Sequence, residues 1–133
     1  MPIIRAWHST KIIFDRFQPF SHFGSREQAE MRATKGARLI EVDLQLSTLK
    51  VLKDHGSWKE AQLRSLERKG FDGVQYLNRF EGIPLEVFDR ARARHGDIDR
   101  LPDSRFRKAL PEAADSWIVF DPRRVAIVNI IEP

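Results

Sequence analysis

The sequence predicts an α+β domain built on a largely antiparallel sheet. Short strand-like apolar runs alternate with longer helical patterns, and turn residues follow almost every run. Strands that are few and linked by turns do not suit a doubly wound parallel sheet. With 133 residues, of which 41% are hydrophobic and 32% charged, the chain has the composition of one globular domain that spans residues 1–133.

Two capping boxes predict the first two helices. Ser25 is followed three residues later by Gln28, and the helix that this pair opens ends at Gly36. Ser57 and Glu60 have the same spacing, so they predict a second helix that ends at the next Lys-Gly pair.

Strands are predicted at residues 3–7, 39–46, 74–77, 117–120 and 125–131. The run at 39–46 alternates apolar residues with Glu41, Asp43 and Gln45, which is typical of a strand with one solvated face. The last two strands are joined at Asp121 and Pro122, a tight-turn signature.

A third helix is predicted from Pro84 to Gly96, because proline suits the first turn of a helix and glycine its end. Its last turns carry three arginines, Arg90, Arg92 and Arg94. They form either a solvated face that complements the helix dipole or a contact to phosphate. Residues 96–115 are polar and rich in proline, and they predict a surface excursion with a short helix near 104–110.

Composition excludes several classes of protein. Without cysteine the chain has no disulfide, thiolate nucleophile or cysteine-ligated metal. The formal net charge of +4 favours an anionic partner such as a nucleotide or a nucleic acid. No apolar run has the length of a transmembrane span, and the N-terminal residues lack the pattern of a signal peptide. We therefore expect a cytoplasmic protein without a membrane partner.

Histidines and aromatic rings concentrate in residues 7–29, which indicates a site for a flat, polar ligand. His8 lies at the end of the first predicted strand, and His22 and Phe23 precede the first helix. Three further rings, spaced three residues apart, either fold over a ligand or fill the core: Phe14, Phe17 and Phe20. The four histidines are too scattered to predict a metal site, and a lone histidine is more often structural than catalytic.

Five segments carry a recognisable combination of residues. They are Trp7–Thr10, Ser21–Ser25 with Ala29, Asp54–Trp58, Gly70–Asn78 with Glu81 and Gly82, and Asp115–Pro122. In this order they resemble ADP-ribosyltransferases, in particular the small domains of phage and mobile-element polyvalent proteins and of bacterial toxins or effectors. The first segment is similar to the His-Gly-Thr strand end of that family. The last resembles the final catalytic-strand region of poly(ADP-ribose) polymerases.

The resemblance implies a split, mostly antiparallel sheet that clasps NAD as a co-substrate. The NAD-binding residues that it implies are His8, Ser9, Thr10, His22, Phe23 and Tyr76. His8 would hydrogen-bond a ribose hydroxyl, and Ser9 or Thr10 would support it. His22 and Phe23 would place an aromatic ring beside the nicotinamide. Tyr76 either adds a second ring or belongs to the core.

The reaction that the resemblance implies cleaves the nicotinamide–ribose bond through an oxocarbenium-like transition state, which a carboxylate stabilises. The polymerases keep a glutamate where this chain has Ser116. We therefore expect Glu81 to supply the carboxylate, with His8 as the second catalytic residue and Asp115 as the alternative to Glu81.

Three functions stay open from the sequence. The first is a mono-ADP-ribosyltransferase acting on a protein or nucleic-acid acceptor, and the second is an NAD glycohydrolase, in which water is the acceptor. The third is a catalytically degenerate module that binds nucleic acid or protein. Ser9 in place of the family's usual glycine, together with Ser116, favours the third. For a toxin, an immunity or antitoxin protein would be a further partner.

Overall fold

The computed structural model describes residues 3–133 as an α+β fold. In chain order the elements are β1 (Ile3–Thr10), β2 (Ser21–Phe23), α1 (Arg26–Arg32), β3 (Arg38–Gln45), β4 (Leu49–Val51), α2 (Glu60–Arg68), β5 (Gly73–Leu77), α3 (Leu85–His95), η1 (Ile98–Arg100), α4 (Asp103–Ala109), β6 (Asp115–Val119), η2 (Pro122–Arg124) and β7 (Val125–Ile131), where η marks a 3-10 helix. The predicted class, α+β with mostly antiparallel strands, is confirmed.

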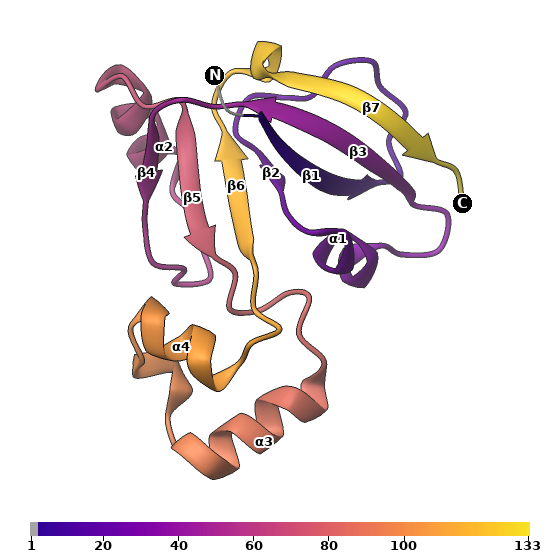
Figure 1. The fold of residues 1–133 in the computed structure, drawn as a ribbon. Coiled ribbons are helices and arrows are strands. Elements are labelled where there is room, and N and C mark those ends of the chain that lie inside the picture. The colour runs from indigo at the N-terminus through magenta and orange to yellow at the C-terminus, as the bar shows by residue number, and fades with distance from the viewer. Residues whose placement is uncertain (1–2) are drawn as a thin grey trace.

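The strands form two sheets that meet at a seam (Figure 1). One sheet has the order β1-β3-β7 and the other the order β2-β6-β5-β4. All neighbouring strands are antiparallel except β4 and β5, which are parallel. At the seam Trp7 and Gly24 exchange backbone N–H···O bonds of 2.8 and 3.0 Å. This bridge places the second half of β1 beside the end of β2.

Alternation along β3 explains how the first sheet builds the core. Ile40, Val42 and Leu44 are buried, whereas Glu41 and Asp43 face outward, where both pair with an arginine of β1. The buried row meets apolar residues of the second sheet and of the loop before β2, among them Phe23, Val119 and Phe17. The predicted solvated face of this strand is confirmed.

The aromatic residues of the loop between β1 and β2 fill the core without forming a helical turn. Phe17 is 5% exposed and contacts Phe14 and Phe23 in edge-on geometry. Phe20 instead packs against Phe120, on the α2 side of the second sheet. The core interpretation of these rings therefore holds.

Helix α2 covers the other face of the second sheet, but it begins later than predicted. Leu63 and Leu66 pack there against strands β5 and β6. The N-cap is Lys59, which makes no side-chain cap bond, so the predicted capping box at Ser57 is wrong. The ring of Trp58 lies 4.9 Å from that of Tyr76. The backbone at Lys59 is extended, so Trp58 contacts Tyr76 from a segment that precedes the helix.

Between β5 and β6 the chain forms a helical insertion with a core of its own. The predicted helices at 84–96 and near 104–110 are confirmed as α3 and α4, whereas the prediction that residues 96–115 are a surface excursion is wrong. The buried apolar residues of the insertion are Leu77, Ile83, Ala91, Ile98, Phe106, Leu110 and Ala113. Arg79, 4% exposed, lies beside this core. Its guanidinium donates to the Leu101 carbonyl at 2.7 Å and to Asp103 at 2.8 Å, and it stacks 4.3 Å from the ring of Phe106.

The last two strands have nearly the predicted bounds, but they do not form a hairpin. The turn between them is η2, with Pro122 near its start and Asp121 accepting the backbone N–H of Arg123. It turns the chain away from the second sheet, and β7 pairs with β3. Strand β4, only three residues long, was not predicted.

Candidate active site

A small pocket of about 20 Å³ lies at the seam between the sheets. Its walls come from β1, β2, α1, the loop after β5, and the facing ends of β5 and β6. The predicted site residues that line it are His8, Ser9, His22, Phe23, Tyr76 and Glu81. The fold therefore brings together residues that lie as far apart in sequence as the first strand and the loop after β5.

Of the predicted site residues, Thr10 lies outside the pocket and Phe23 is almost fully buried in its wall. The Thr10 hydroxyl accepts the backbone N–H of Ile12 at 3.0 Å. Phe23 is only 2% exposed, and its ring packs against His8 and Phe17. Phe23 thus forms a wall behind His8, and little of its ring is free to stack on a ligand.

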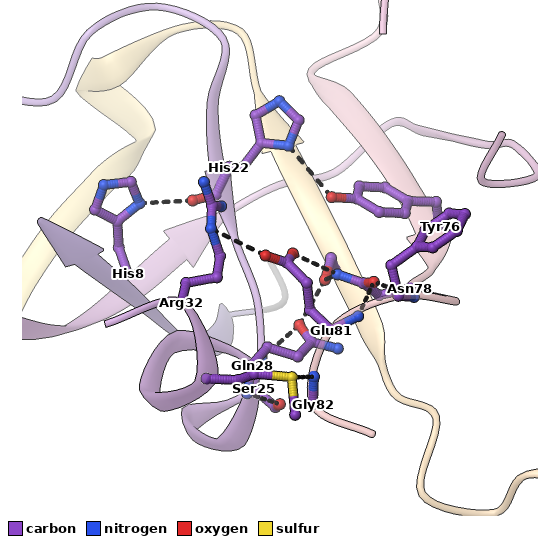
Figure 2. Close-up of polar contacts among 12 residues, drawn as sticks. His8, His22, Ser25, Gln28, Arg32, Tyr76, Asn78, Glu81 and Gly82 are labelled. Carbon is purple, nitrogen blue, oxygen red and sulfur yellow. Dashed lines mark hydrogen bonds and ion pairs between the residues drawn. The ribbon is translucent and has the colours of Figure 1, made fainter. Parts of the chain in front are cut away.

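Hydrogen bonding fixes the tautomer of His8. Its Nδ1 lies 2.7 Å from the carbonyl oxygen of His22 (Figure 2). A carbonyl can only accept, so Nδ1 carries the proton. Burial, aided by the charge of Arg32, lowers the pKa of His8 and keeps the ring neutral. The Nε2 atom is therefore an acceptor, which suits a hydroxyl donor on a ligand.

His22 and Tyr76 form a neutral polar pair at the other side of the pocket. The Nδ1 atom of His22 lies 3.2 Å from the Tyr76 hydroxyl (Figure 2). Burial lowers the pKa of His22 to about 4, with Arg32 and His8 adding to the effect, and burial raises the pKa of Tyr76 to about 12. Near neutral pH both rings are uncharged, so the pair can exchange hydrogen bonds with a polar, uncharged ligand group.

The pKa of His22 predicts how stability depends on pH. The unfolded chain has the ordinary value of 6.5, so between pH 6.5 and about 4 it binds a proton that the folded state does not. We expect the contribution of His22 to make the free energy of unfolding fall as pH is lowered through this window, and this contribution to level off below about pH 4. Urea denaturation of the wild type and of His22→Gln measures this contribution. The variant should show a shallower fall, and parallel pH profiles would contradict the assignment.

Glu81 is held by partners on both of its carboxylate oxygens. Asn78 donates to Oε1 at 3.0 Å, and Arg32 of α1 pairs with Oε2 at 3.0 Å (Figure 2). The Asn78 side-chain oxygen also accepts the backbone N–H groups of Phe80 and Glu81. The loop after β5 is thereby shaped around Asn78, which aims the carboxylate into the pocket.

Gln28 connects this loop to strand β6. Its side-chain oxygen accepts the Ser116 hydroxyl at 2.6 Å, and Asn78 donates to the same hydroxyl at 3.1 Å. A side chain at Gly24 would collide with Gln28, since its Cβ would lie 1.8 Å from Oε1. Gly82 is similarly close, with its Cβ 2.7 Å from Gln28 Cγ. These glycines give the buried carboxamide its space.

No pattern in the sequence assigns Gln28, Arg32 or Asn78 to the site. Gln28 was predicted only as the third helical residue of a capping box, and that role is confirmed because Ser25 and Gln28 exchange both bonds. The sequence signal for a buried side chain here is the pair of glycines, Gly24 and Gly82, because a Cβ at either position would collide with Gln28. Arg32 and Asn78 depend on contacts between distant segments, which no local pattern shows.

A second, wider pocket of about 370 Å³ adjoins the first. The two share His22, Arg32, Tyr76 and Glu81. Aromatic side chains of Trp58 and Phe80 line the wider one, together with the buried carboxylate of Asp54. The Arg32–Glu81 ion pair therefore lies where the two pockets meet, and the wider of the two is within the size range of small-molecule sites.

Asp115, the alternative carboxylate, lies outside both pockets. It accepts from Arg107 at 2.6 Å and from Gln75 at 3.1 Å. Its neighbour Ser116, by contrast, lines the first pocket. The geometry thus favours Glu81 over Asp115 as a group that can reach a ligand.

Comparisons of the chain with protein-family models, with curated proteins and with solved structures found no match. None of the helices within residues 3–133 has both the length and the apolar character that a membrane crossing requires.

Proposed function

We propose that the protein is an NAD-dependent mono-ADP-ribosyltransferase. The observation that carries the proposal is the convergence of His8, His22, Tyr76 and Glu81 on one pocket at the seam of two sheets. The α+β class with mostly antiparallel strands is consistent with the general class expected from the sequence. In this proposal His8 Nε2 accepts a ribose hydroxyl, and the neutral rings of His22 and Tyr76 lie beside the nicotinamide.

The position of Glu81 supports a transferase reaction despite the serine on β6. Ser116 is linked to Glu81 through Asn78, by hydrogen bonds of 3.1 and 3.0 Å. A carboxylate thus enters the same pocket from the neighbouring loop. A fixed negative charge there would stabilise the positive charge that develops on the ribose as nicotinamide leaves.

Arg32 has a defined part in the proposal. Its ion pair with Glu81 is half-exposed, with side chains 53% and 32% accessible, so breaking the pair costs only about 1 kcal/mol or less. The pyrophosphate of NAD offers the guanidinium a more highly charged partner. We infer that NAD draws Arg32 away and leaves the Glu81 carboxylate free to face the ribose.

Incubation with NAD tests the proposal. The wild type should release nicotinamide and, in the presence of cell lysate, attach labelled ADP-ribose to a macromolecule. His8→Ala, which removes the ribose acceptor, should weaken both NAD binding and turnover. Nicotinamide release without macromolecular labelling would identify an NAD glycohydrolase. Absence of both NAD binding and nicotinamide release would reject the proposal in favour of a binding module.

A further inference from the structure

Cationic side chains line two adjoining grooves between α3 and α4. The larger groove, of about 420 Å³, is lined by the cations Arg90, Arg94 and Lys108 and by the ring of His95. The second, of about 330 Å³, shares His95 and Lys108 and adds Arg105. We call the surface formed by Arg90, Arg94, Arg105 and Lys108 the cationic groove.

The charges of the cationic groove are not compensated within the protein. None of its four cations takes part in an ion pair among residues 3–133. The neighbouring Arg100 and Arg107 do, with Asp97 and Asp115. The single carboxylate that lines either groove is that of Glu112. A concave surface with this excess of positive charge attracts an anionic partner.

The chemistry of the groove favours phosphate groups. Three of the four cations are arginines, whose planar forks match phosphate oxygens better than a lysine does. The floor contains small apolar side chains of Val87, Ala91 and Ala109, which leave room for a chain. The larger groove is a concavity of about 420 Å³, the scale of a small-molecule pocket, so a single extended strand can enter it and a duplex cannot. We propose that the cationic groove binds the sugar–phosphate backbone of a single-stranded nucleic acid.

The place of the groove in the fold connects it to the pocket. The insertion that carries it lies between β5 and β6; Glu81 near its start and Ser116 just after its end both line the first pocket. In Figure 1, α3 and α4 lie beyond the ends of β5 and β6 from which the insertion departs. A bound strand would therefore be held near the pocket. If the transferase proposal is correct, nucleic acid is the acceptor class; this step alone depends on that proposal.

Fluorescence anisotropy with the full chain and labelled single-stranded DNA or RNA of about 12 nucleotides tests the groove. Binding should weaken as salt is raised from about 50 to 200 mM. Arg90→Gln/Arg94→Gln should reduce affinity about tenfold and lower the salt slope by about 1.4, as expected for two lost phosphate contacts. The matched control is Arg68→Gln/Lys69→Gln on α2, which removes the same charge from another exposed surface and should change affinity less than about twofold.

Several outcomes would contradict the proposal that the cationic groove binds a single-stranded nucleic acid. They are no binding of either strand at the lowest salt, an equal loss in the α2 control, equal affinity for a polyglutamate peptide, and tighter binding of a duplex. No NAD is present in these measurements, so they succeed or fail independently of nicotinamide release. Strand binding that depends on Arg90 and Arg94, without any NAD cleavage, would leave the groove established and reject the transferase.

Discussion

Glu81→Gln should lower nicotinamide release by roughly a hundred- to a thousandfold, the range seen when one preorganised electrostatic group is removed from an active site. Gln keeps the oxygen that accepts from Asn78 and removes the charge that Arg32 now pairs with. The carboxylate acts on charge that exists only in the transition state. Steady-state kinetics and NAD titration should therefore show a loss of kcat with NAD affinity nearly unchanged.

Asp115→Asn is the matched control for this experiment. It removes the same charge from a carboxylate that lies outside the pocket and is engaged by Arg107 and Gln75. Its nicotinamide release should stay close to that of the wild type. Full activity in Glu81→Gln, with a loss confined to Asp115→Asn, would transfer the catalytic charge to the start of β6.

Arg79→Met should destabilise the protein by about 2 to 4 kcal/mol, because it removes a buried guanidinium that donates to backbone carbonyls and pairs with the partly exposed Asp103. The substitution leaves the carbonyls of Ile98 and Leu101 without their donor and Asp103 without its cation. It also removes the guanidinium that stacks on Phe106. Urea denaturation measures the loss, and hydrogen exchange should show α3 and α4 losing protection before the two sheets.

Arg107→Met provides the comparison for Arg79. Its guanidinium also pairs with an aspartate, but the side chain is 48% exposed, against 3% for Arg79. An exposed pair contributes about 1 kcal/mol or less. Equal destabilisation by the two substitutions would show that Arg79 does not anchor the insertion.

The fold was predictable where a local pattern and a tertiary contact agree. The alternation of β3 matches its buried row, and the capping box at Ser25 forms with both of its bonds. The second capping box failed because the chain is still extended where Trp58 packs on Tyr76. Strand β4 pairs in parallel with β5 through only three residues, too few for a period to appear.

The candidate site was predictable at strand ends and hidden elsewhere. His8 and His22 stand out in sequence because each precedes a turn or a helix start. The capping box alone explains why residue 28 is a glutamine, so the sequence does not indicate that Gln28 also bonds Ser116, 88 residues away. In the sequence, Arg32 is an ordinary cation in the last turn of a helix, and its ion pair with Glu81 becomes visible only in the structure. Residues that serve two purposes are the ones local patterns miss.

The helical insertion leaves and rejoins its sheet at adjacent positions. Leu77 pairs with Asp115, and the Asn78 N–H donates to the Ala114 carbonyl at 3.0 Å. The insertion is topologically an enlarged hairpin loop, so its length does not set the register of β5 and β6. With its own core, it can be lengthened, shortened or exchanged while the strands beside the pocket keep their places. Only the first residues of the insertion, Asn78 and Glu81, are tied to the pocket, so α3 and α4 can change while the residues at the pocket stay in place.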